Sequence, residues 1–156
     1  MSKKIAIVFG ASGFLGSHVA EALSSDGYQV RLFDRTPSDF KRGDQEMIVG
    51  DIMNLEDVTK AIQGASIVYN FAAIADIDEA NEKPLATAEV NILGNMNVLE
   101  ASRLSGVRRF IFASSVYVYS ESGSFYRASK QAAERFIETY HCLLYTSDAA
   151  DDSLRV

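Results

Sequence analysis

The sequence has few of the residues that would anchor a protein through disulfides, metals or membrane insertion. Its 156 residues include one cysteine, two histidines, two prolines and no tryptophan. A single cysteine cannot form an internal disulfide, which fits a reducing compartment such as the cytoplasm. With only His18 and His141 available, we expect no metal site. No apolar run approaches the ~20 residues of a membrane-spanning helix, and no signal-peptide cleavage pattern follows the basic start.

Positive charge is also in short supply. The chain carries 15 Lys and Arg against 21 Asp and Glu, a formal net charge of -6. This balance gives no general attraction to nucleic acid or to anionic membranes, so we expect neither as a partner. The length suffices for one domain with a sizeable core. No internal repeat or low-complexity segment interrupts it.

A glycine-rich turn at residues 10–16 organises the chain. It follows an apolar run at residues 5–9, typical of a buried parallel strand, and precedes a helical pattern. Gly10 allows a sharp turn, Gly13 lets a phosphate approach the backbone, and Gly16 lets the helix pack on the sheet. The helix N-terminus presents unpaired N–H groups to an anion. The G-x-x-G-x-x-G spacing in this context predicts a dinucleotide site, although a simple strand-to-helix turn would also explain it.

An acidic residue stands where such a site needs one. Asp34 ends the second expected strand, residues 28–33, and lies 18 residues after Gly16. There a carboxylate can bind the adenosine ribose hydroxyls, unless it only serves the turn that follows. Arg35 beside it could meet a 2′-phosphate, but the carboxylate would repel that group. The sequence therefore favours NAD over NADP.

Strands and helices alternate along the rest of the chain. Further strands are expected at residues 47–49, 66–71 and 109–113, and helices at residues 54–62, 85–105 and 126–140. Asn54 is expected to cap the first of these helices and Gly64 to end it. In the second, an apolar face is expected from Leu85, Ala88, Ile92, Met96 and Leu99. This alternation predicts an α/β fold with a doubly wound parallel sheet.

Three side chains are placed for hydride chemistry on an alcohol. Ser115 follows the fifth strand, at the carboxyl edge of the sheet, and Tyr126 and Lys130 lie at i and i+4 of one helix. Removing a hydroxyl proton needs a base, and a lysine ammonium one turn away favours a tyrosine phenolate in that role. A serine hydroxyl can hold the substrate oxygen beside it. The tyrosine–lysine spacing alone is common, but after a nucleotide turn and a Ser-Ser strand end it is specific.

Together these motifs resemble the extended short-chain dehydrogenase/reductase family, the NAD-dependent nucleotide-sugar epimerases and dehydratases. The matching segments cover residues 3–141 in the family's order. The resemblance implies a Rossmann-like NAD-binding domain, a nucleotide-sugar substrate and a homodimer. It implies that Tyr126 is the acid/base, that Lys130 positions the nicotinamide ribose, and that Ser115 binds the reacting oxygen. The implied cofactor-binding residues are Gly10, Ser12, Gly13, Phe14, Leu15, Gly16, Asp34, Arg35, Asp51, Ile52, Phe71, Ala72, Ala73, Asn91 and Lys130.

The chain departs from the family at several positions. Asn70 stands where many members carry histidine, Asn95 replaces a threonine, and Ser120 replaces a glycine. The loop between Ser115 and Tyr126 is shorter than in the sugar epimerases. These departures put the substrate in doubt, not the cofactor. The competing functions are an NADP-dependent carbonyl reductase of the same family and a non-catalytic module that senses dinucleotides. Asp34 argues against the reductase, and the intact tyrosine and lysine argue against the sensor.

The last residues do not fit the pattern. Residues 142–152 resemble the in-frame translation of a transposase adapter used to prepare sequencing libraries. We therefore expect a truncated NAD-binding domain at residues 1–141, without the family's substrate-binding half, and a non-native tail at residues 142–156. For a full-length protein, the resemblance suggests a dimer through helices 85–105 and 126–141. Its apolar surface would come from Met96, Leu99, Leu104, Phe136 and Ile137.

Overall fold

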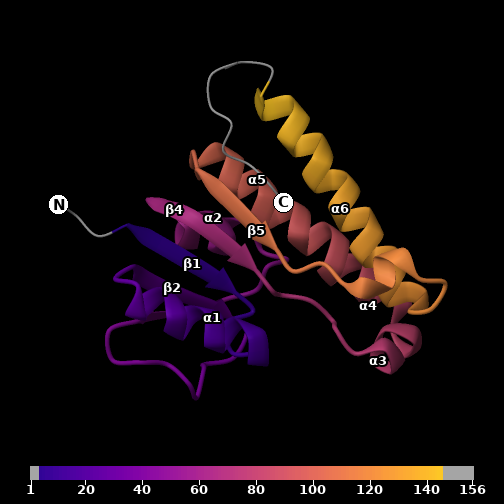
Figure 1. Cartoon of the computed structure of the whole chain (residues 1–156), viewed down its shortest axis with the longest axis horizontal. Coiled ribbons are helices and arrows are strands. Elements are labelled where there is room, and N and C mark those ends of the chain that lie inside the picture. Colours follow the sequence, from indigo (N-terminus) through magenta and orange to yellow (C-terminus); the bar gives the residue numbers. More distant parts are fainter. Residues whose placement is uncertain (1–3, 146–156) are drawn as a thin grey trace.

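The computed structural model describes residues 4–145 and contains one five-stranded parallel sheet (Figure 1). The strands are β1 (Ile5–Phe9), β2 (Gln29–Asp34), β3 (Glu46–Val49), β4 (Ala65–Asn70) and β5 (Arg109–Phe112). Their spatial order is β3-β2-β1-β4-β5, and all four pairings are parallel. In this Rossmann-like order, β2 and β3 are added on one side of β1 and β4 and β5 on the other, as in a doubly wound sheet. The expected fold class is therefore confirmed, and the strand limits differ from the expected ones by one residue or so.

Helices connect and cover these strands. The α-helices are α1 (Phe14–Ser25), α2 (Leu55–Ile62), α3 (Ile77–Glu82), α4 (Pro84–Ala88), α5 (Asn95–Leu104) and α6 (Ser124–Tyr145). A π-helix, η1 (Glu89–Gly94), joins α4 to α5, and a short 3₁₀ helix, η2 (Val116–Tyr119), follows β5. In Figure 1, α5 and α6 run side by side. None of the helices between residues 4 and 145 is long and apolar enough to cross a membrane.

Side-chain alternation along β1 gives the sheet two apolar faces. Ile7 and Phe9 pack with residues of α2 and α5, including Val58 and Val98. Ala6 and Val8 point the other way, toward α1. Because both faces of β1 are covered, the strand reads as a continuous apolar run rather than an alternating one. Local signals also hold at α2, where the Asn54 side chain accepts hydrogen bonds from the first backbone N–H groups, as expected.

The helical stretch at residues 84–104 differs from the expectation. Leu85 is 80% exposed and Ala88 is also exposed, whereas Leu99 is buried. The expected single apolar face is therefore wrong. The physical reason is η1: its wider turns add a residue to the helical repeat and rotate the face that precedes it relative to the face that follows. The buried side of this stretch instead carries the polar residues Thr87, Asn91 and Asn95 before the apolar Val98 and Leu99.

The last helix crosses the expected domain boundary. It begins at Ser124, two residues before Tyr126, and runs past His141 to Tyr145. Its Tyr140 hydroxyl donates to a Glu100 carboxylate oxygen on α5 at 3.1 Å, which ties the two helices together. The rest of the expected tail, residues 146–156, lies outside the described residues.

Candidate functional site

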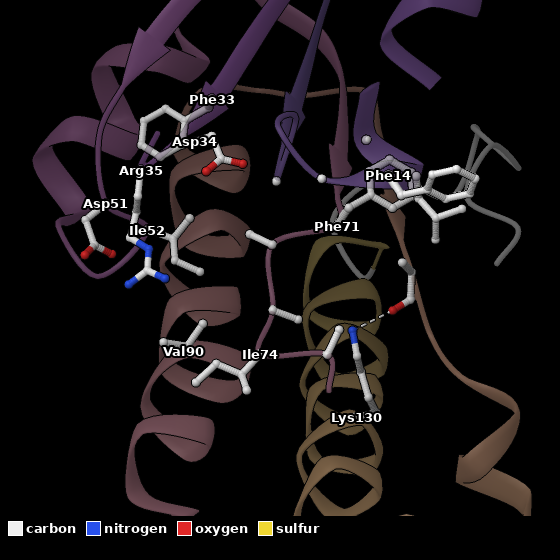
Figure 2. A pocket seen from close by; sticks show the side chains of 18 of the residues that line it. Phe14, Phe33, Asp34, Arg35, Asp51, Ile52, Phe71, Ile74, Val90 and Lys130 are labelled. Atoms are coloured by element: carbon white, nitrogen blue, oxygen red, sulfur yellow. Dashed lines mark hydrogen bonds between the residues drawn. The ribbon is translucent and has the colours of Figure 1, made fainter. Parts of the chain in front are cut away.

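A cavity of about 380 Å³ lies at the carboxyl edge of the sheet, where the strand order reverses. This is the place where open α/β sheets bind ligands, and the volume is that of a small-molecule site. The wall comes from the turn after β1, from the ends of β2, β4 and β5, and from η1 and α6 (Figure 2). Most of the cofactor-binding residues expected from the sequence line it: Gly10, Gly13, Phe14, Leu15, Gly16, Asp34, Arg35, Asp51, Ile52, Phe71, Ala72, Ala73 and Lys130.

The glycine turn owes its shape to two backbone contacts that leave no room for side chains. Gly10 has φ +74°, and a Cβ there would lie 2.6 Å from the Ala72 nitrogen. A Cβ on Gly16 would lie 2.2 Å from the Gly10 oxygen, so α1 can approach the turn only because Gly16 lacks one. Gly13 is different, because a Cβ there would meet only the Gly10 oxygen, at 3.4 Å. Gly13 therefore leaves backbone open toward the cavity, as a bound diphosphate requires.

Asp34 is held in place at the end of the cavity that is formed by the glycine turn and the end of β2, here called the nucleotide end after the role expected for it. Its Oδ2 accepts a hydrogen bond from the Ser12 backbone N–H at 3.0 Å, and its Oδ1 accepts one from the Thr36 N–H at 3.3 Å. Ser12 itself does not line the cavity and acts on it through Asp34. Figure 2 shows Arg35 extending along the same rim, beside Asp51. The rim therefore presents an anchored carboxylate next to an arginine.

Two of the departures from the family meet each other below the strand ends. Asn70 is buried at the end of β4, and its Nδ2 donates to Asn95 Oδ1 at 2.8 Å. Asn70 Oδ1 accepts from the Ala72 N–H at 3.2 Å, which fixes the backbone that lines the cavity. The Asn95 Nδ2 has no hydrogen-bond partner within the described part of the chain. The pairing of these two side chains is a tertiary contact between β4 and α5.

Lys130 is the buried charge at the other end of the cavity. This end is formed by residues that follow β4 and β5 and by residues of η1 and α6, and it is here called the chemistry end after the role expected for it. Its side chain is almost fully enclosed, with 3% of the residue exposed, and Nζ donates to the Ala113 oxygen at 2.8 Å. Nζ also lies 4.7 Å from the centre of the Phe112 ring and 5.7 Å from that of Tyr126. Burial lowers the pKa of Lys130 from 10.5 to about 8. An ammonium with further N–H groups therefore lies at the cavity wall, as Figure 2 shows for Lys130.

Asn91 does not line the cavity, but its side chain connects two of the segments that do. Its Oδ1 accepts from the Ile74 N–H at 2.8 Å, and its Nδ2 donates to the Ile74 oxygen and to the Ser129 hydroxyl. The Ser129 hydroxyl in turn donates to the Tyr126 backbone oxygen at 2.7 Å. Asn91 lies within η1, and π-helical segments often occur at functional sites. The loop after β4 and the helix that carries Tyr126 are thus tied to one side chain.

The two serines after β5 occupy different places. Ser114 lines the cavity, and its hydroxyl donates to the Glu134 carboxylate on α6. Ser115 is not among the lining residues; its hydroxyl accepts from the Tyr117 N–H and caps η2. The catalytic role expected for Ser115 stays a prediction. Sequence reasoning noted Ser114 only as the neighbour of Ser115, and it gave no site role to several other lining residues: Phe33, Gly50, Ile74, Ala75, Val90 and Ala113. Only strand ends facing one edge bring them together.

Residues 4–145 hold no group of three or more His, Cys, Asp or Glu side chains that could bind a metal ion. The polar groups at the cavity are the backbone N–H groups of the glycine turn, an anchored carboxylate that accepts hydrogen bonds and a buried ammonium that donates them. This set is suited to a dinucleotide. Gly13 leaves the close backbone approach that a diphosphate needs, and Asp34 lies at the end of β2, where dinucleotide-binding folds carry the acidic residue for a ribose. The residues present therefore fit NAD.

Comparisons with known proteins agree with this site. Residues 6–143 match the model of the NAD dependent epimerase/dehydratase family. A 3-beta-hydroxysteroid dehydrogenase of Mycolicibacterium neoaurum is 35% identical over 114 residues, covering 70% of this chain and 31% of that protein. A UDP-glucose 4-epimerase of Klebsiella pneumoniae is 32% identical over 127 residues, covering 74% of this chain and 91% of that protein.

Comparison with solved structures also finds an epimerase. The UDP-glucose 4-epimerase of Thermus thermophilus in complex with NAD has a TM-score of 0.81 at 29% identity, covering 89% of this chain and 51% of that one. The chain thus spans about half of that structure and about a third of the Mycolicibacterium dehydrogenase. With a family match over nearly the whole chain and the NAD-type cavity in place, this chain belongs to the NAD dependent epimerase/dehydratase family.

Proposed function

We propose that this chain forms the NAD-binding part of an enzyme that epimerises or dehydrates a nucleotide sugar through transient hydride transfer. One observation carries the proposal: Tyr126 and Lys130 lie at the wall of the same cavity that the glycine turn and Asp34 form at its other end. A dinucleotide held by the turn would have its nicotinamide end near the tyrosine. A module that only senses dinucleotides has no need of this second end.

Residues of the nucleotide end would hold the cofactor. The N–H groups at the start of α1 would bind the diphosphate, and the Asp34 carboxylate would accept hydrogen bonds from the ribose hydroxyls. Asp51 and Ile52 would flank the adenine, and residues 71–73 would line the path between the two ends. Because a carboxylate repels a 2′-phosphate, Asp34 favours NAD over NADP and argues against a carbonyl reductase that uses NADP.

Residues of the chemistry end would manage the proton. Bound NAD supplies the hydride acceptor. The Tyr126 phenolate would take the proton of the substrate hydroxyl as the hydride leaves the carbon, and would return the proton as a hydroxyl when the hydride comes back. The Lys130 ammonium would stabilise the phenolate form and donate to the nicotinamide ribose. The Ser115 hydroxyl would hold the reacting oxygen beside the tyrosine.

A second candidate is the NAD-dependent oxidation of a 3β-hydroxysteroid. The observation in its favour is the similarity to steroid dehydrogenases, including 33% identity over 117 residues with a 3 beta-hydroxysteroid dehydrogenase/Delta 5-->4-isomerase of Mycobacterium tuberculosis. Both candidates begin by oxidising a secondary alcohol, so they need the same cavity residues. They differ in the substrate's body and in whether the hydride returns to it.

We also propose that the whole protein is a homodimer through the helices at residues 84–104 and 124–145. Leu104 is 62% exposed and Leu93 is half exposed, while Phe136 and Ile137 are half-buried on α6. Leu99, expected in this surface, is buried against the core and is not available. A monomer by light scattering at micromolar concentration contradicts this part of the proposal.

Calorimetric titration of the chain with NAD and with NADP tests the cofactor part. We expect NAD to bind more tightly, and absence of binding to either cofactor would sink the proposed function. In an active protein that contains this chain, hydride transfer from UDP-glucose and from a 3β-hydroxysteroid distinguishes the two candidates. Tyr126→Phe should lower turnover by the ~10²–10⁴ typical of general acid–base catalysis. Unchanged turnover in that variant would revive the sensing module.

A further inference from the structure

Glu134 continues the helix face that carries Tyr126 and Lys130. The three residues lie at i, i+4 and i+8 of α6, so their side chains follow one another along the same side. The Glu134 carboxylate accepts a hydrogen bond from the Ser114 hydroxyl, and Ser114 lines the cavity. Glu134 itself does not line the cavity. It therefore reaches the site only through the residues beside it.

The segment after β5 is fastened to α6 at consecutive residues. Lys130 Nζ donates to the Ala113 oxygen at 2.8 Å, and the next residue, Ser114, donates to Glu134 one helical turn further on. Beside Lys130 on the helix, Gln131 Nε2 donates to the Val118 oxygen at 2.9 Å, near the end of η2. The Ser114 contact therefore holds the carboxylate on the side of the helix where the lysine lies.

The ammonium of Lys130 is compensated for its burial by the Ala113 oxygen and by the Phe112 and Tyr126 rings, none of which carries a full negative charge. Around it, α6 contributes two titratable groups, Tyr126 and Glu134, whereas β5 and the following residues contribute Phe112, Ala113 and Ser114. Burial lowers the pKa of Lys130, and the charge of Glu134 opposes that change. Glu134 is the carboxylate that lies one helical turn after Lys130 on α6.

We propose that Glu134 is a positioning residue of the cavity: held by the Ser114 hydroxyl, its carboxylate keeps the buried Lys130 in the ammonium form that the site uses. The inference rests on the proposed function, because only there does Lys130 need its charge. Ser114 then has a role that its place in a Ser-Ser pair does not reveal, since it fixes the carboxylate rather than the substrate. The feature joins two segments 20 residues apart.

Competitive acylation of the chain with acetic anhydride, followed by mass spectrometry at each lysine, tests the proposal. In Glu134→Gln the amide can still accept from Ser114 but carries no charge, so Lys130 should acylate about three- to tenfold faster at neutral pH. Ser114→Ala frees the carboxylate without removing it, so the rate should rise in the same direction but less. The matched control is Glu138→Gln, whose carboxylate pairs with Arg135 at 2.7 Å on the exposed side of α6. It should leave Lys130 unchanged.

A measurement on the unmodified chain covers the case in which a variant does not fold. The ¹³C resonance of the Glu134 carboxyl should move near pH 8, where Lys130 loses its proton. Absence of that movement overturns the proposal, as does a Lys130 acylation rate that is equal in Glu134→Gln and Glu138→Gln. Neither readout depends on NAD, so a failure of cofactor binding alone would count against the proposed function and not against this inference.

Discussion

The two ends of the cavity are built in different ways. The nucleotide end is made by a nearly continuous stretch of chain, from Gly10 to the start of α1, together with Asp34 at the end of the neighbouring strand. The contacts that shape its turn are backbone contacts, and its anchored carboxylate, Asp34, lies at the rim. The chemistry end gathers residues from β4, η1, β5 and α6, and its central group is a buried ammonium.

The difference separates two kinds of vulnerability. At the nucleotide end, a single added methyl group meets backbone that cannot move aside. At the chemistry end, packing is less critical than the pairing of buried polar atoms, because each unpaired donor or acceptor there carries its full desolvation cost. Substitutions at the two ends should therefore fail for different reasons and by different amounts.

The largest effect should come from Gly16→Ala at the nucleotide end. The new Cβ would lie 2.2 Å from the Gly10 oxygen, so α1 must move away from the turn, at a cost of more than about 3 kcal/mol in unfolding free energy. Gly43→Ala is the control, because a Cβ there meets nothing within 4 Å. Urea denaturation measures both, and equal stability of the two variants would show that the turn tolerates a side chain.

Asn91→Leu should be the most damaging substitution at the chemistry end. It leaves the N–H and the oxygen of Ile74 without their partner and disconnects Ser129, which should cost about 2–3 kcal/mol. Asn97→Leu removes an amide that donates to two backbone oxygens, those of Ile52 and Met53, on a less enclosed surface, and should cost less. The same denaturation series compares them. A larger loss at Asn97 would mean that the buried network is not what holds this end together.

Lys130→Met, unlike the two substitutions above, should raise the free energy of unfolding at neutral pH. The folded pKa of Lys130, about 8, lies below its ordinary value of 10.5. The unfolded chain therefore binds more protons between these values, and wild-type stability should rise with pH across that window. Below about pH 8 the buried charge costs stability, so Lys130→Met should be more stable there by about 2 kcal/mol, with the gain fading toward pH 10.5.

Thermal unfolding from pH 7 to 10.5 measures this dependence. The control is Lys60→Met, because Lys60 lies on the surface in an i,i+4 pair with Glu56. Its pH profile should follow that of the wild type. A gain for Lys130→Met that does not change with pH would show that packing, and not charge, is responsible. In the same variant NAD should bind more weakly, since the ammonium is gone.

The smallest effect should be the loss of cofactor preference in Asp34→Ala. Without the carboxylate, NAD loses its ribose partner and NADP loses a repulsive charge, so the ratio of the two affinities should fall by about tenfold. Asp39→Ala, in the exposed loop that follows, should leave the ratio unchanged. Titration of both cofactors decides it. Tighter binding of NADP than of NAD to the unmodified chain would contradict the assignment of Asp34.

Much of the nucleotide end could be predicted from the sequence, because its signals are local. Glycine spacing, an apolar strand before it and an acidic residue at the next strand end all lie within about 30 residues, and each has one dominant structural solution. The doubly wound parallel sheet followed from the alternation of elements. The cap at Asn54 was equally local, since a side chain two and three residues from its partners needs no tertiary contact.

Only the tertiary structure decided the chemistry end. A period of 3.6 residues could not reveal η1, so the face of Leu85 and Ala88 was placed inward when it is exposed. Nor could adjacency in sequence tell Ser114 from Ser115, because Ser114 finds its partner on a neighbouring helix whereas Ser115 caps the turn that follows it. The burial that moves the pKa of Lys130 arises from elements more than 15 residues apart. Local propensities determine which elements form, but desolvation and pairing exist only once those elements have packed.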